Sequence, residues 1–557
     1  MTPMKEWIET RWPLSSVMHL ALDEEIPGGA RFAYSLGVAV LIAFMLQTAT
    51  GIMQLFFYVP STDHAYDSIG YLRTRVPFGW LIHGLHYWGA NAMIALVVFH
   101  MSRVFLWGAY KKPRELTWLA GVTLLLTTYV FSFTGTPLHW DQRGYWIGEV
   151  STSIAGTAPV FGAFMKHFLR GGGDTMGQLA LSRFFGLHTM LLPLALAGLF
   201  GIHFIAMRHF GSVGPWGVKN PPPGPLWPDQ IFKDAVTGSA VVYILVALAV
   251  FFPPKYAGLV DPLDTSYIPM PEWNFLFFYE ALKYFHGRFE AVGTVGVPTV
   301  LVLLLVLLPF VDRNPERNPL KRPIALAAAL VLAAIVIGLS IEGCLSPFYG
   351  QTAAKRTARG ESSTAAMIKA ALAVKASEAV ETSPVTPSGE GTGRYSPPEL
   401  EKKGPPGAAS YSIGSAQRGA DIFAKNCSPC HGPAGKSVLP NPGSREGRVP
   451  SLNPIDRELF NADAETFAQN IDRFIQHGSV PKGPKPVIRM PAFGETNNLT
   501  QQEIANVEAY VLSLNGVDRA QLINPGMMPK RFFALATVGY ALVLLTLGGL
   551  RRRRYSE

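Results

Sequence analysis

Cysteine and charge are both scarce in this chain of 557 residues. Its three cysteines, Cys344, Cys427 and Cys430, indicate no disulfide framework. Charged residues make up only 16% of the chain, which is low for a soluble protein and normal for a membrane protein. The net charge of +9 does not indicate nucleic-acid binding, because the basic residues cluster in short loops between apolar runs.

A cleavable signal sequence is also missing. The N-terminus, MTPMKEWIETRWPLSSVMHL, has no short apolar stretch followed by a small-residue cleavage site. We therefore expect no removable signal peptide, and the first membrane span would direct insertion. The length of the chain exceeds what one compact core holds, so we expect two or more domains.

The sequence contains several long apolar runs. Runs near the ~20 residues needed to cross a bilayer predict about eight transmembrane helices. They lie at about 33–58, 80–107, 116–135, 184–207, 236–252, 292–311, 323–342 and 532–550. The predicted fold class is therefore all-α, a membrane helical bundle with a small all-α domain attached.

Composition divides the chain into five parts. The apolar runs fill residues 1–220 and 221–345, which a Pro- and Gly-rich loop separates. Residues 346–410 are rich in Ala, Ser, Thr, Pro and Gly, which is typical of a flexible linker. Residues 411–515 form a polar block with helical patterns at both ends, and 530–551 are predicted to be a terminal anchor.

The charges of the loops predict the orientation in the membrane. With a cytoplasmic N-terminus, the inner loops hold more Lys and Arg, including Lys111, Lys112 and Arg114, and the tail RRRR at 551–554 also falls inside. An even number of spans places both termini inside and the 411–515 block outside. We therefore expect a multi-pass protein of a bacterial cytoplasmic membrane, in contact with lipid.

Four histidines lie within the apolar runs. His86 and His100 are fourteen residues apart in the second run, and His188 and His203 are fifteen apart in the fourth. Fourteen residues are about 40° short of four helical turns and rise ~21 Å, so each pair of rings lies on nearly one face. Two antiparallel spans would then pair His86 with His188 and His100 with His203. A single intramembrane histidine can be a hydrogen-bonding residue, but two pairs suit the irons of two six-coordinate haems.

Glycines repeat with the same spacing. Gly37 and Gly51 are fourteen apart in the first run, and so are Gly121 and Gly135 in the third. Glycine permits close approach to a flat porphyrin, although glycine is also common in membrane helices.

The polar block carries a second haem pattern. NCSPCHG at 426–432 contains C-x-x-C-H, in which Cys427 and Cys430 would bond covalently to a haem and His431 would bind its iron. Met490, in IRMPAFG, is the candidate for the second axial ligand, and core packing is the alternative for that residue. Met527 and Met528 are less suitable because they lie next to the last span.

Residues 11–345 resemble cytochrome b of the bc1 and b6f quinol–cytochrome c oxidoreductases. The resemblance rests on the fourteen-step histidines and glycines, on GTPLHWDQRGYW at 135–146 and on PEWN at 271–274. It implies a di-haem four-helix domain in 1–220 and a subunit IV-like three-helix domain in 221–345. KKPRELTW at 111–118 is similar to the b6 type, and the 411–515 block resembles class I cytochromes c.

The resemblance implies a quinol-oxidation site near PEWN. There Glu272 would serve as the base that accepts a proton from quinol, and an interfacial Glu is the alternative. Asn274 stands where the family has Tyr, and His139, which we expect to face water, stands where it has Pro. Because Ser35 stands near the expected position of a cysteine, the extra thioether-linked haem of some b6 proteins should be absent. We expect Cys344 to be a packing residue.

The resemblance also implies an inner quinone site. FKDAVTG at 232–238 is similar to the segment that lines it, so Lys233 and Asp234 would deliver protons to the reduced quinone. Arg208 would hold a haem propionate or a quinone oxygen. Ordinary juxtamembrane charge is the alternative for all three.

The predicted protein is therefore the haem-carrying subunit of a proton-translocating quinol–cytochrome c oxidoreductase, with two haems b, one haem c and quinone. One electron from outer quinol would cross the membrane through the b haems to the inner quinone, and the other would reach the c-type haem. The expected partners are a Rieske iron–sulfur protein on a separate chain, a soluble or membrane-bound cytochrome c or another outer acceptor, and a second copy in a homodimer. The rival hypotheses are a di-haem subunit of another quinone-linked respiratory enzyme and a haem-free anchor or transporter with an appended cytochrome.

Overall fold

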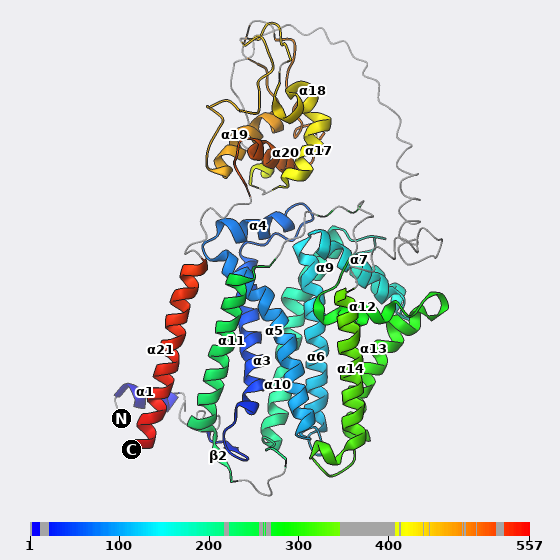
Figure 1. Cartoon of the computed structure of the whole chain (residues 1–557), viewed down its shortest axis with the longest axis vertical. Helices are drawn as coiled ribbons and strands as arrows, with labels where there is room; N and C mark the ends of the chain where they lie inside the picture. The colour runs from blue at the N-terminus through cyan, green and yellow to red at the C-terminus, as the bar shows by residue number, and fades with distance from the viewer. Residues whose placement is uncertain are drawn as a thin grey trace.

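Helices dominate the computed structural model, which confirms the all-α prediction. It describes residues 3–11, 22–216, 222–254, 260, 262, 269–345, 407–411, 414–437, 439–444, 446–481, 483, 486–496, 498–519 and 529–556. Most of the expected linker, 346–406, and Met527 and Met528 lie outside the described residues. One bundle of long helices carries a small helical domain beyond one of its ends (Figure 1).

Eight helices of the described residues are long and apolar enough to span a membrane, as the sequence predicts. They are Phe32–Leu55 (α3 from Leu36), α5 (Gly79–Leu106), Glu115–His139 (α6 to Gly135), Gln178–Phe210 (α9, Gln178–Gly186, and α10, Leu192–Phe210), Leu226–Phe251 (α11 from Ile231), Val292–Val311 (α13 from Val297), α14 (Pro323–Leu345) and α21 (Pro529–Ser556). The fourth span starts at Gln178, earlier than expected, because α9 continues into α10 through a π turn, Leu187–Leu191.

Shorter helices mark the two ends of the bundle. α4 (Ala65–Arg75), α7 (Gln142–Gly156), α8 (Gly162–Arg170) and α12 (Leu276–Leu282) lie towards the small domain (Figure 1). The N-terminal helix α1 (Pro3–Arg11) and the C-terminus lie at the opposite end (Figure 1). The two short strands, β1 (Glu25–Ile26) and β2 (Gly224–Pro225), pair antiparallel at that end (Figure 1).

The first four spans form a bundle in which α3 packs on α5 and α6 packs on α10. Ala43, Met93 and Leu196 are buried at its centre. At Gly84 a Cβ would lie 2.8 Å from the Cβ of Ala249, so this glycine lets α5 touch α11 of the second half. Small residues at such crossings allow helices to pack closely without a hydrophobic driving force in lipid.

A buried ionic network joins the two halves of the membrane bundle. The carboxylate of Asp312, which follows α13, lies 2.9 Å from Lys111 Nζ and 3.1 Å from Arg322 Nη1, and the Tyr110 hydroxyl donates to it. Burial alone would raise the pKa of Asp312, but the hydrogen bonds from Tyr110, Lys111 and Arg322 lower it below its usual value. The charge of Asp312 thus ties the loop after α5 to the start of α14.

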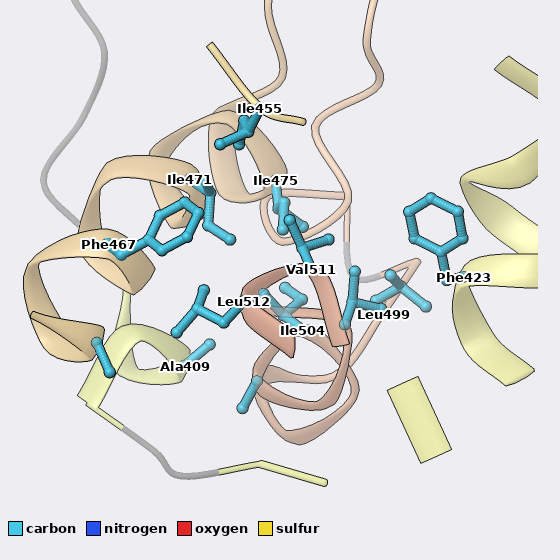
Figure 2. Packing of buried hydrophobic residues seen from close by; sticks show 13 residues of the cluster. Ala409, Phe423, Ile455, Phe467, Ile471, Ile475, Leu499, Ile504, Val511 and Leu512 are labelled. Atoms are coloured by element: carbon cyan, nitrogen blue, oxygen red, sulfur yellow. The ribbon is translucent and has the colours of Figure 1, made fainter. Parts of the chain in front are cut away.

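The small domain contains α17 (Ala416–Asn426), α18 (Ser428–His431), α19 (Ala464–His477) and α20 (Gln501–Leu514). Thr500 and Glu503 form a capping box that starts α20. α17 crosses α20 at Gly419, where a Cβ would lie 1.9 Å from the carbonyl oxygen of Asn506. Figure 2 shows the core of this domain, with Phe467, Ile504 and Leu512 among its fully buried members.

Two buried carboxyl groups lie where the first and last described segments of the small domain meet. Glu508 and Asp472 are both 0% exposed. Arg519 Nη1 donates to Glu508 at 2.7 Å, and its Nη2 donates to the carbonyl of Ala409 at 3.2 Å. Burial raises the pKa of Glu508 well above its usual value, because one guanidinium does not neutralise two carboxylates.

The terminal helix α21 docks on α11 through aromatic rings. Tyr243 stacks on Tyr540 with ring centroids 4.6 Å apart, and its hydroxyl lies 3.0 Å from Thr537 Oγ1. Phe251 contacts Phe533 edge-on at 4.8 Å. The segment that follows the small domain is therefore attached to a defined face of the membrane bundle.

Replacing Arg322 by Met should destabilise the solubilised protein by about 3–5 kcal/mol, because it removes one of the two cations that contact the Asp312 carboxylate, together with the bonds of its guanidinium to Tyr110 and Phe105. A thermal melt of the purified chain measures the loss. Arg313→Met is the matched control, since Arg313 is exposed in the same loop. Equal melting temperatures for the two variants would contradict the tie between the halves.

Replacing Glu508 by Gln should make the small domain less sensitive to pH. A carboxyl whose folded pKa is raised contributes stability that is complete below its unfolded pKa, near ~4.3, and is lost as pH rises through the folded value. Gln cannot ionise, so at pH 8–9 the variant should unfold at a higher temperature than the parent. Glu458→Gln, at an exposed position, should melt like the parent at every pH.

Candidate functional site

Two pairs of histidines face each other inside the first four spans. His86 of α5 lies opposite His188 of the π turn, with ring centroids 6.3 Å apart and ring planes at 73°. His100 of α5 lies opposite His203 of α10, with centroids 6.5 Å apart and planes at 72°. The structure thus brings together the partners expected from the sequence, one pair towards each end of the bundle.

Hydrogen bonds fix the tautomer of three of these rings. Thr50 Oγ1 donates to the carbonyl of Leu46 at 2.7 Å, so its oxygen must accept from His86 Nδ1 at 3.0 Å. Thr134 has the same arrangement with His188, at 3.1 Å. His203 Nδ1 donates to the carbonyl of Thr117 at 3.0 Å. With Nδ1 protonated, Nε2 keeps the lone pair that binds a metal.

The four glycines lie against the four imidazoles. A Cβ would come within 2.8 Å of His188 Cε1 at Gly135 and within 3.2 Å of His86 Cε1 at Gly51. At Gly37 the corresponding distance to His100 is 3.3 Å, and at Gly121 the distance to His203 is 3.4 Å. The sequence predicts that these glycines approach a porphyrin, whereas the structure places their backbone against the histidine rings.

A proline determines where the ring of His188 lies. Pro193 is the second residue of α10. Its ring has no N–H and clashes with the preceding turn, so the chain widens locally into the π turn that carries His188. The same arrangement of a π turn and a proline occurs in the second half of the bundle. There Pro298, the second residue of α13, follows the π turn Val292–Gly296.

The spacing of the pairs fits iron bound between two imidazoles. A metal–nitrogen bond of about 2.0–2.1 Å and roughly 1.1 Å from Nε2 to the ring centre give centroids about 6.2–6.4 Å apart. The observed 6.3 and 6.5 Å agree with this geometry. Rings in van der Waals contact, in contrast, would lie closer.

A further histidine pair lies beside the first. His83, which is 3% exposed, contacts the ring of His139 at 5.5 Å between centroids and 77° between planes. His83 Nδ1 lies 3.2 Å from Gln54 Oε1. Our expectation that His139 faces water was wrong, because this ring is partly buried against His83. Sequence spacing alone could have indicated His83, one turn before His86.

The PEWN segment contacts two helices of the first half of the bundle. Glu272 Oε1 lies 3.0 Å from Arg143 Nη1 of α7. Trp273 Nε1 donates to Asn91 Oδ1 of α5 at 2.5 Å, and Asn274 is 4% exposed. Among the described residues, neither amide atom of Asn274 has a hydrogen-bond partner. Sequence reasoning missed Arg143 because nothing in the spacing links position 143 to position 272.

The residues expected at the inner quinone site have protein partners. Gln230 Nε2 donates to Asp234 Oδ1 at 2.8 Å and to Ser35 Oγ at 3.1 Å. Lys233 lies over the ring of Phe32, 5.5 Å from its centre, and Arg208 pairs with Glu24. Gln230 thus links Asp234 to Ser35, whereas Lys233 and Arg208 contact other residues.

The C-x-x-C-H segment forms the short helix α18. His431 Nδ1 donates to the carbonyl of Pro450 at 3.0 Å, which leaves Nε2 as the ligand atom. Burial lowers the pKa of His431, so the ring is neutral. Burial also raises the pKa of the Cys427 thiol to about 12, which is the opposite of the lowered pKa of a reactive thiol.

Met490 lies in the same domain on a loop beside Ser479, with which it exchanges two backbone hydrogen bonds of 2.9 and 3.1 Å. Its side chain packs with Cys427 against the hydrophobic core of the domain. Cys344, in contrast to the packing role expected, is exposed on α14.

Three family models match the chain. Residues 21–211 match cytochrome b/b6/petB, residues 259–359 match cytochrome b(C-terminal)/b6/petD, and residues 416–515 match cytochrome c. Cytochrome b families imply haem b, and the cytochrome c family implies haem c. The second match also argues against a di-haem subunit of an unrelated respiratory enzyme.

The chain is also similar to individual cytochrome b6 proteins and to a solved structure of a respiratory complex. Cytochrome b6 of Prochlorococcus marinus (strain MIT 9211) and of Synechococcus sp. (strain WH7803) are each 39% identical over 214 residues, which is 38% of this chain and 98% of theirs. A solved structure titled "Hyperthermophilic respiratory Complex III" is 29% identical, with a TM-score of 0.56, and covers 61% of this chain and 91% of that chain.

Gly135→Ala should displace the His188 ring, since the new methyl group would lie 2.8 Å from Cε1. We expect loss of up to half of the b-type absorbance of the purified chain. Gly198→Ala is the matched control, because a methyl group there meets nothing within 4 Å and should leave the spectrum unchanged. Equal spectra for both variants would contradict the packing described for the pair.

Proposed function

Because this chain belongs to the cytochrome b/b6 family and is a subunit of a quinol–cytochrome c oxidoreductase, we propose that it oxidises quinol beside Glu272 and carries two haems b and one haem c. The observation that carries the proposal is the geometry of the two histidine pairs. Both have a separation that fits two imidazoles that would bind one iron. His86 and His188 would hold the outer haem, and His100 and His203 the inner haem.

When bound, these haems would supply reversible one-electron transfer between the two ends of the bundle, and the two histidine pairs would hold their irons. The protein residues orient the ligands. Thr50 and Thr134 keep Nδ1 protonated, and the glycines leave room for each ring against the helix backbone. Second-shell hydrogen bonds of this kind fix the orientation of a ligand.

Glu272 would be the base for quinol. Its side chain is 18% exposed, so it is shielded and still reachable. A carboxylate within hydrogen-bond reach of the quinol hydroxyl accepts its proton. The buried amide of Asn274 would offer a donor and an acceptor in place of the tyrosine hydroxyl of the family.

At the inner end, Asp234 and Lys233 would deliver protons to the quinone, and Arg208 would hold a haem propionate or a quinone oxygen. Asp234 is supported here by its burial and by its hydrogen bond from Gln230. The ion pair of Arg208 with Glu24 favours a role in holding the β1–β2 corner over direct contact with quinone.

In the 411–515 domain, Cys427 and Cys430 would attach the haem, and His431 and Met490 would bind its iron. A Met/His pair raises the reduction potential relative to two histidines, so the high-potential electron would end there. The linker 346–410 and the anchor 530–551 would hold the domain near the membrane.

Membership in this family implies a multi-subunit complex. We propose a Rieske iron–sulfur protein on a separate chain, an outer cytochrome c or other acceptor, and a homodimer of the complex. The chain is a multi-pass membrane protein. The charge pattern supports a bacterial cytoplasmic membrane, with both termini inside and the c-type domain outside.

Glu272→Gln should lower the turnover of quinol by about 100-fold or more in the isolated complex, because Gln cannot accept the proton. The b and c absorbance bands should stay at parental height. Glu316 is exposed in the loop between α13 and α14, so the control variant Glu316→Gln should retain parental turnover. Parental turnover in Glu272→Gln would remove Glu272 from the proposed mechanism.

A further inference from the structure

The partner of Glu272 in the substrate-free structure is a guanidinium. Arg143 stands in the first turn of α7, and Glu272 immediately precedes the 3₁₀ turn Trp273–Phe275. Arg143 Nη1 and Glu272 Oε1 lie 3.0 Å apart, with the side chains 33% and 18% exposed. The two residues are separated by 129 positions, so the tertiary fold alone creates this contact.

The surroundings hold Arg143 in place. Tyr87, the neighbour of His86 on α5, contacts Arg143 and faces Glu272. Asp141, two residues before Arg143, uses its carboxylate as a helix cap and accepts from the Gly144 N–H at 2.7 Å. Arg143 therefore joins three elements at one point, namely α5, α7 and the PEWN segment.

We propose that Arg143 is the fixed counter-ion for quinol deprotonation at this site, an inference that rests on the proposed role of Glu272 as base. The substrate class is a quinol with an ionisable hydroxyl. In this step the quinol O–H bond breaks, an O–H bond forms on Glu272, and the negative charge moves from the carboxylate to the quinol oxygen. Arg143 stays positive throughout, so it compensates the charge before and after the transfer.

The distances allow Arg143 to stay close to the negative charge, first on Glu272 and then on the quinol oxygen. A quinol oxygen that bonds Glu272 Oε1 at about 2.6–3.2 Å lies no more than about 6.2 Å from Arg143 Nη1. A preplaced cation near a developing oxyanion needs no reorganisation as the charge moves, which is the source of its effect. Without Arg143, the proton transfer would create a quinolate with no facing cation.

Variants of Arg143 in the intact complex test the inference. Arg143→Gln should lower kcat about 10- to 100-fold for a short-chain ubiquinol or naphthoquinol analogue, with KM changed less than about threefold. Arg143→Lys should recover most of the lost kcat, because it keeps the charge. Lys321→Gln, which removes an exposed charge at the other end of the bundle, should match the parent.

The double variant separates this inference from the proposed function. If Arg143 acts only through the charge that Glu272 transfers, Arg143→Gln/Glu272→Gln should be no slower than Glu272→Gln alone. Loss in Glu272→Gln together with parental kcat in Arg143→Gln would overturn the inference and leave Glu272 as base. A Lys variant as slow as the Gln variant would assign Arg143 a packing role and overturn it as well. Parental kcat in Glu272→Gln would instead remove Glu272 as the base and, with it, the premise on which this inference rests.

Discussion

The packing of a histidine ring against a glycine backbone is the contact on which the membrane part depends. At Gly135 and Gly51 the missing side chain is the space that the imidazole fills. Threonine, one residue earlier in each case, accepts a hydrogen bond from Nδ1–H and turns Nε2 towards the partner helix. Thr-Gly on one helix and His on the next thus form one unit, repeated for the two outer ligands.

The features that depend on helical periodicity could be predicted from the sequence. Apolar length predicts all eight spans, and the fourteen- and fifteen-residue steps predict which histidines meet, because both follow from the helical repeat alone. Contacts between distant segments could not be predicted. The pairing of Arg143 with Glu272 and the turn of His139 towards His83 depend on how loops pack, which no local pattern encodes. The π turn at His188 was also missed, although Pro193 was its visible cause.

Three charged residues join separate parts of this protein. Asp312 ties the two halves of the bundle, Arg519 ties the entry of the small domain to its exit, and Arg143 ties α7 to the PEWN segment. Buried or shielded ion pairs are weak sources of net stability but strongly specify which groups must be adjacent. In the last case the same arrangement places a cation beside the proposed base.

The ratio of b-type to c-type haem in the purified chain tests the central claim most directly. A pyridine haemochrome spectrum measures both in one sample. Two facing histidine pairs and one C-x-x-C-H segment predict two haems b for each haem c. A ratio of one or less, in a preparation that retains its quinol oxidation, would contradict the account of the histidine pairs.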